Sequence, residues 1–168
     1  MRASRLLPFF LVLLAAVQPR LHAETVVIEG AHVFDGERNL GEQAVVIRDG
    51  RIAYVGAKDA ADPALVRGAR KLDYRGKYLM PGLVSDHAHV GNSSGVEHGD
   101  RFYTRDNVVR DLRQFQAYGI TTVTALGMNG PAFYAIRAEV DRDPALGAQL
   151  RGAGPGIGVP GGAPPAET

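Results

Sequence analysis

The sequence predicts an α/β protein in which a small β domain precedes alternating parallel strands and helices. Residues 24–78 contain short β-branched and apolar runs separated by tight turns. From residue 79 onward, apolar runs of strand length alternate with segments of helical period. With 45% hydrophobic and 22% charged residues, the composition is that of a globular domain. Such an alternation opens either an α/β barrel or a doubly wound sheet.

The first 23 residues have the composition of a secretory signal peptide. Arg2 and Arg5 give a charged start, residues 6–17 form an apolar stretch, and residues 21–23 form a cleavage site. The alternative is a membrane anchor, but this stretch is shorter than the ~20 apolar residues that span a bilayer. We therefore expect a periplasmic or secreted protein that has no membrane association after cleavage.

Charge and cysteine content exclude several classes of protein. The formal net charge is +1. Removing Arg2, Arg5 and Arg20 with the leader, which contains no acidic residue, leaves 16 basic and 18 acidic residues. No basic run is present that would bind nucleic acid or an anionic membrane. Because the chain has no cysteine, it forms no disulfide and offers no thiol ligand or nucleophile.

The clearest local signal in residues 24–78 is a β-hairpin over residues 44–56. Its centre is Asp49-Gly50, and this dipeptide tolerates the positive φ angles of a type I′ turn. Residues 60–67 are expected to form a short helix and residues 70–74 a further strand. So small a sheet buries little area, which implies that the domain needs a partner surface.

A strand predicted from Leu79 to Val90 carries His87 and His89 at its end. Side chains alternate along a strand, so both histidines point the same way. Imidazole nitrogens at the end of a buried strand need polar partners, and a zinc or similar divalent ion accepts both. The alternative is a pair of surface or core histidines that are satisfied by other partners.

The later segments supply the helices and strands of the α/β pattern. Residues 91–101 form a polar loop whose Glu97 and His98 could line a pocket. A helix is predicted over residues 104–118, with one apolar stripe through Val108, Leu112, Phe115 and Tyr118. A strand at 120–126, a helix at 129–142 and a strand at 149–153 follow. The Gly- and Pro-rich residues 152–165 are typical of a flexible tail.

Three motifs resemble the start of the catalytic domain in the amidohydrolase superfamily, within its imidazolonepropionase-like and Xaa-Pro dipeptidase-like branch. They are Pro81-Gly82, His87-Ala88-His89 and the segment 118–123. The resemblance selects a metal-dependent (β/α)8 TIM barrel preceded by a small β-sandwich domain. It implies that His87 and His89 bind a divalent metal, expected to be zinc. The family has an aspartate where this chain has Ser85, and the parity of Asp86 is opposite to that of the histidines.

The resemblance covers the mature chain but only the first part of the family's length. Residues 79–168 allow about three barrel strands at roughly 30 residues per βα unit, whereas a complete barrel takes ~250 residues. We expect a signal peptide at 1–23, part of the β-sandwich at 24–78, and a barrel truncated after about three strands at 79–168. The lysine, two histidines and aspartate that complete the family's metal centre lie on later strands, so the chain is expected to be inactive alone and its catalytic residues stay unassigned.

The function that the resemblance implies is hydrolysis of carbon–nitrogen bonds by metal-activated water. The expected substrate is a small molecule or a dipeptide-like compound, with its bond in a non-peptide amide, a cyclic amide or a dipeptide. The alternative is a non-catalytic secreted fragment, or a β interaction module that carries a vestigial half-barrel.

Overall fold

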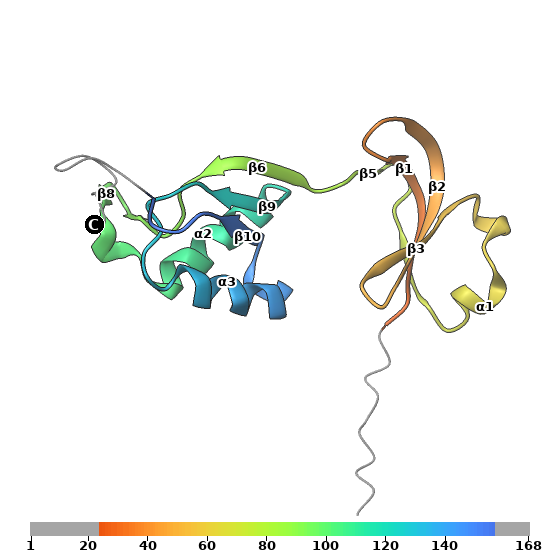
Figure 1. The fold of residues 1–168 in the computed structure, drawn as a ribbon. Helices are drawn as coiled ribbons and strands as arrows, with labels where there is room; N and C mark the ends of the chain where they lie inside the picture. The colour runs from red at the N-terminus through yellow and green to blue at the C-terminus, as the bar shows by residue number, and fades with distance from the viewer. Residues whose placement is uncertain (1–23, 157–168) are drawn as a thin grey trace, which may run out of the picture. The chain divides into compact units, whose positions relative to one another are not determined.

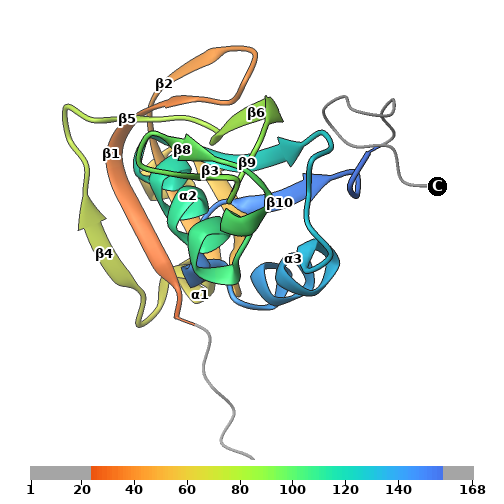
Figure 2. The same cartoon turned by 90° about the vertical axis from the view of Figure 1, so that its left-hand side faces the viewer.

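The computed structural model of the 168-residue chain describes residues 24–156. The predicted signal peptide lies outside the described residues, as does most of the predicted Gly- and Pro-rich tail. The chain divides into two compact units, Met1–Leu79 and Met80–Thr168. Figures 1 and 2 show their ribbons, with the first unit in orange to yellow-green and the second in green to blue.

The first unit is built on one mixed sheet of five strands. The strand order is β3-β2-β1-β4, and β5 also pairs with β1. Strand β1 is antiparallel to β2 and parallel to β4 and β5. A 3-10 turn, η1 (Lys58–Ala60), and a short helix, α1 (Pro63–Val66), connect β3 to β4. The strands are β1 (Val26–Phe34), β2 (Asn39–Arg48), β3 (Arg51–Gly56), β4 (Arg70–Asp73) and β5 (Tyr78–Leu79).

The predicted hairpin is formed by β2 and β3, which pair antiparallel. Asp49 and Gly50 have φ angles of 54° and 70°, the left-handed values that a type I′ turn requires, so the turn prediction is confirmed. The small core of this unit contains Ile28, Val33 and Val45. Residues 24–79 form a single five-stranded sheet. That this sheet is the N-terminal part of a β-sandwich stays a prediction, since a sandwich has two packed sheets.

The second unit alternates strands and helices as the sequence predicts. Its parallel sheet has the order β10-β9-β6, and residues 80–156 form no closed barrel. An additional hairpin of two very short strands follows β6. The elements are β6 (Leu83–Ala88), β7 (Ser93–Ser94), β8 (Glu97–His98), η2 (Asp100–Phe102), α2 (Arg105–Ala117), β9 (Ile120–Ala125), α3 (Phe133–Arg142), η3 (Pro144–Leu146) and β10 (Gln149–Gly152).

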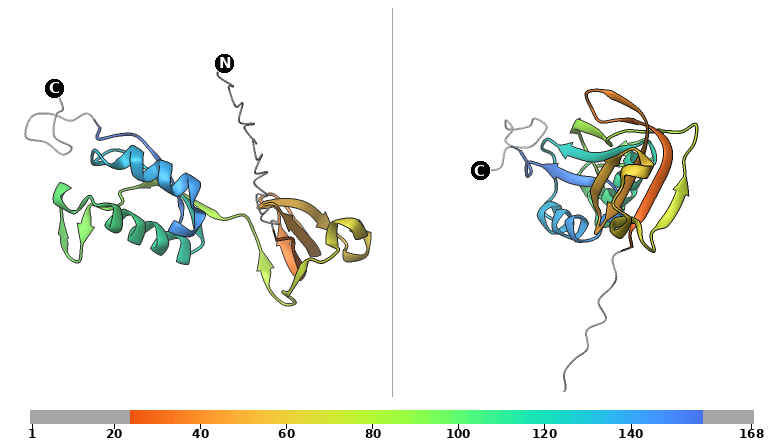
Figure 3. Two further views of the ribbon diagram at one scale, coloured as in Figure 1. Left: turned by 90° about the horizontal axis from the view of Figure 1, so that it is seen from below. Right: turned by 90° about the vertical axis from the view of Figure 1, so that its right-hand side faces the viewer.

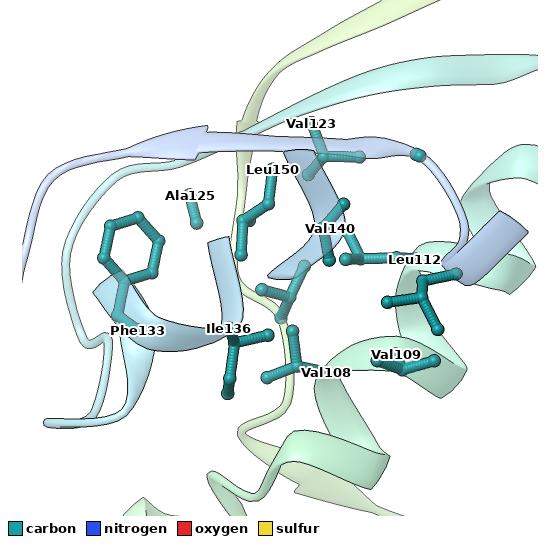
Figure 4. Packing of buried hydrophobic residues seen from close by; sticks show 12 residues of the cluster. Val108, Val109, Leu112, Val123, Ala125, Phe133, Ile136, Val140 and Leu150 are labelled. Atoms are coloured by element: carbon teal, nitrogen blue, oxygen red, sulfur yellow. The ribbon is translucent and has the colours of Figure 1, made fainter. Parts of the chain in front are cut away.

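Both helices of this unit pack against one face of the sheet, as Figures 1 and 3 show. The Thr104 hydroxyl caps the start of α2 by accepting a hydrogen bond from the Asn107 amide at 3.3 Å. Figure 4 shows the core between helices and sheet. It contains Leu112 from α2, Val123 from β9 and Leu150 from β10, all fully buried. Among residues 80–156, no helix covers the opposite face of the sheet.

Three sequence predictions need correction. The strand predicted from Leu79 to Val90 is interrupted, because Leu79 ends β5 and β6 starts after Pro81, which has no backbone N–H to donate. Tyr118 is not part of the buried stripe of α2: it follows the last helical residue and is 76% exposed. The loop 91–101 contains the β7–β8 hairpin, since Gly95 with φ 61° supplies a tight turn.

Candidate metal centre

His87 and His89 lie at the end of β6, on either side of Ala88. Ala88 packs against the hydrophobic core, and Val90 is fully buried within it. Because side chains alternate along a strand, His89, between Ala88 and Val90, points away from that core. Both histidines are exposed. The chain therefore presents two imidazoles side by side at the carboxyl end of a parallel strand.

The two imidazole rings are close enough to share one metal ion. Their centroids are 5.5 Å apart, and their planes meet at 69°. A zinc ion binds imidazole nitrogen at roughly 2.0–2.1 Å, so two rings on one tetrahedral ion have centres about 5 Å apart. The pair therefore fits two positions of a tetrahedral site with little movement of the backbone.

The described residues supply no further ligand to this pair. Within residues 24–156, no group of three or more His, Cys, Asp or Glu side chains could hold a metal ion. Zinc sites in proteins generally have three or four protein ligands. A metal ion held by the two imidazoles would therefore need further ligands, from water or from groups outside this range.

Strand β6 contains a β-bulge that includes His87. Ser85 pairs with Val123 and Ala88 pairs with Ala125, so three steps along β6 match two steps along β9. Asp86 and His87 together occupy the extra space, and both are exposed. Strict alternation fails at a bulge, so parity alone does not separate Asp86 from the face that carries the histidines. Ser85, at the position of the family aspartate, is half-buried.

The backbone on both sides of His89 is held by hydrogen bonds. The Ala88 carbonyl accepts a hydrogen bond from the Leu126 amide at 3.3 Å. Beyond Val90, the Gly91 amide donates to Asp111 Oδ2 on α2 at 2.8 Å. Gly91 has φ 75°, and a Cβ there would lie 2.4 Å from a Val108 methyl carbon. These contacts leave His89 a defined position between an ordered strand end and an ordered loop.

Glu97 and His98, the other candidate residues, lie apart from this arrangement. They form β8 and are exposed. The Glu97 carboxylate pairs with the Arg101 guanidinium at 2.9 Å, four residues further along the chain. Neither residue is among those that line the cavity next to His89.

That cavity has a volume of ≈ 400 Å³, a size typical of small-ligand pockets. Sequence reasoning did not single out its polar lining, because isolated polar residues on a loop and on a helix form no motif. Phe115, Tyr118 and Ile120 supply apolar surface. The lining residues are His89, Ser93, Asp111, Gln114, Phe115, Tyr118 and Ile120.

The chain is similar in sequence to enzymes of known activity. It is 35% identical over 75 residues to an imidazolonepropionase of Porphyromonas gingivalis, an alignment that covers 40% of this chain and 18% of the relative. It is 28% identical over 125 residues to the L-hydantoinase of Paenarthrobacter aurescens, which covers 73% of this chain and 25% of the relative. The chain therefore spans a quarter or less of the length of these relatives. No family model matches it.

The chain is also similar in fold to solved structures of hydrolases. Molinate hydrolase matches with a TM-score of 0.67 and 26% identity, covering 82% of this chain and 31% of that protein. A prolidase in complex with N-methylphosphonate-L-proline matches with a TM-score of 0.62 and 25% identity, covering 77% and 32%. Fold, histidine pair and relatives together place the chain in the amidohydrolase superfamily. Within that superfamily, it is similar to imidazolonepropionases and prolidases.

Proposed function

We propose that this chain contributes two metal ligands, His87 and His89, to a hydrolase of carbon–nitrogen bonds. The observation that carries the proposal is the 5.5 Å separation of the two imidazole centroids at the carboxyl end of a parallel strand. Barrel enzymes build their active sites at this end of their strands. Neutral imidazole, thiolate and carboxylate are the common protein ligands of zinc.

A divalent ion bound at this pair would acidify water and polarise a substrate carbonyl. His87 and His89 would hold the ion through ring nitrogens, and they are neutral when they do so. The hydrogen bonds that flank His89 would orient its ring before any ion arrives. General acid–base catalysis needs a further group besides the two metal-binding histidines. None of the described residues joins the histidines as a third metal-binding side chain.

The proposed substrate class follows from the relatives. An imidazolonepropionase and an L-hydantoinase are named for cyclic compounds that contain carbon–nitrogen bonds, and the prolidase structure holds a proline derivative. A small cyclic amide or a dipeptide-like molecule is therefore the substrate class that we propose. We also propose export to the periplasm or the outside, on the composition of residues 1–23. Among the described residues, no helix has the length and apolarity to cross a bilayer.

A zinc titration followed by NMR of the imidazole resonances tests the proposal. The chain that starts at Glu24 contains four histidines, and His32 and His98 serve as internal references. We expect the ring resonances of His87 and His89 to shift together as zinc is added, while those of His98 stay in place. Equal shifts for all histidines would show non-specific binding and would exclude a metal centre at this pair.

A further inference from the structure

Two buried asparagines lie at the same end of the sheet as the histidine pair. Asn92 is 7% exposed and Asn129 is 2% exposed, and they are the buried polar or charged residues of the part of the chain that the structure describes. Burial of a side-chain amide destabilises a fold unless the amide forms hydrogen bonds. A buried asparagine is therefore retained where its hydrogen bonds perform a specific task. Both residues belong to loops that follow parallel strands.

Asn129 connects the ends of β9 and β10. Its Nδ2 group donates to the Ala125 carbonyl at 3.1 Å and to the Ala153 carbonyl at 2.6 Å. Its Oδ1 atom accepts a hydrogen bond from the Tyr103 hydroxyl at 3.3 Å, in the loop that follows β6. Burial raises the pKa of Tyr103 to about 12, so the phenol keeps its proton and acts as the donor at neutral pH. One amide thus joins the loops after all three strands.

Asn92 connects the loop after β6 to the peptide just before Asn129. Its Nδ2 group donates to the Met128 carbonyl at 2.9 Å, and the Met128 amide donates to the Pro155 carbonyl at 2.8 Å. Met128 adopts φ 56°, a left-handed conformation that is unfavourable for a residue with a side chain and persists only where its surroundings impose it. Asn92 is three residues after His89, and Val90 between them is fully buried.

Stability alone does not explain the choice of asparagine at position 92. Its Oδ1 atom is buried and has no hydrogen-bond partner among the described residues. A flipped amide would set Oδ1 against the Met128 carbonyl, so the observed orientation is the favourable one. A buried acceptor left unpaired destabilises a fold. The benefit that offsets this is the fixed link between the backbone that follows His89 and the loop after β9.

We propose that Asn92 and Asn129 are positioning residues for the histidine pair: they fasten the three strand-end loops together and so hold His89 beside His87 before metal binds. This inference rests on the proposed metal function, which gives the preformed pair its purpose. Groups that orient metal ligands without touching the metal commonly change its affinity 10- to 100-fold when they are removed. We expect effects at the lower end of that range, because each asparagine acts through the backbone.

The test uses Asn92→Asp and Asn129→Asp, which keep the shape of the side chain but replace its N–H donors by a carboxylate. Val140→Ala is the control, because Val140 is 2% exposed in the same core but lies on α3 and belongs to no strand-end loop. In the metal-free protein, we expect inter-ring nuclear Overhauser effects between His87 and His89 that both aspartate variants lose and V140A keeps. In zinc titrations, we expect a dissociation constant about 10-fold higher for the aspartate variants than for V140A.

Should the aspartate variants fail to fold, hydrogen exchange in the unmodified protein decides the question. Zinc should then slow exchange of the Met128 and Ala153 amides, which lie in loops without a metal ligand, because coupling between sites is reciprocal. Unchanged exchange would overturn the positioning role, as would inter-ring effects that survive in both aspartate variants. If the unmodified protein shows the inter-ring effects but binds no zinc, the proposed function is wrong. The positioning role is then decided by the spectra of the metal-free protein and its aspartate variants alone.

Discussion

Replacing Gly152 by alanine should disrupt the pairing of β10 with β9. Gly152 pairs with Ala125 and has φ 145°, a conformation that residues with a side chain rarely adopt. An added Cβ would lie 2.0 Å from the Ala125 oxygen, 2.8 Å from its carbonyl carbon and 3.0 Å from its nitrogen. All three are backbone atoms of the central strand, so relief of the overlap requires the strands to separate.

The expected loss of unfolding free energy for Gly152→Ala is about 2–6 kcal/mol, from about 1–3 kcal/mol of backbone strain and about 1–3 kcal/mol of overpacking. Gly95→Ala is the matched control. Gly95 has φ 61°, and no atom lies within 4 Å of its added Cβ, so only the backbone cost of about 1–2 kcal/mol applies.

Urea unfolding followed by far-UV circular dichroism measures the difference between these variants. Helices α2 and α3, of 13 and 10 residues, both belong to the second unit, whereas α1 in the first unit has 4 residues. The helical signal therefore reports on the unit that contains Gly152. A loss for G152A that is no larger than the loss for G95A would refute the steric argument and the close approach of β10 to β9.

Three further predictions concern core packing, acid stability and processing. Leu112→Ala should lower the free energy of unfolding by about 2–5 kcal/mol in the same urea experiment, whereas Tyr118→Ala should change it by less than about 0.5 kcal/mol. Equal losses in the two variants would contradict the observed burial of Leu112 and exposure of Tyr118. The Arg105 guanidinium lowers the pKa of the Glu139 carboxyl below its ordinary value of 4.5. This ion pair therefore stabilises the fold at pH values above 4.5, and its contribution is lost as the pH falls through the lowered pKa. Melting temperatures should accordingly fall less on acidification for Glu139→Gln than for the unmodified protein, and parallel curves would refute the contribution. Mass spectrometry of the protein from its native host should show a chain that starts near Glu24, and an intact Met1 in the cytoplasm would contradict export.

The features that the sequence predicted correctly are those set by local chemistry. Asp49-Gly50 imposes its turn whatever surrounds it. The helix predicted over residues 104–118 forms as α2 (Arg105–Ala117), and Thr104 caps it by a contact three residues along the chain. The alternation of apolar strands with amphipathic helices is likewise a periodic signal, and it gives the order of elements in the second unit.

The features that sequence reasoning missed depend on contacts between distant segments. The bulge at Asp86 and His87 lies where β6 and β9 pair with unequal steps, which no pattern within β6 reveals. Tyr118 continues an apolar period, yet the helix ends before it and leaves it exposed. Asn92 and Asn129 follow strands at separate places in the chain, and only folding brings each to the carbonyls that it binds.

Calorimetric zinc titration of single variants shows whether His87 and His89 together bind one metal ion. His87→Ala and His89→Ala should each weaken zinc binding by at least about 10-fold, because a site that loses one of two protein ligands retains little affinity. His98→Ala removes an exposed histidine from β8 and serves as the matched control. Zinc binding by H98A should equal that of the unmodified protein. Binding that is unchanged in H87A and H89A, or reduced equally in all three variants, would contradict the binding of one metal ion by His87 and His89.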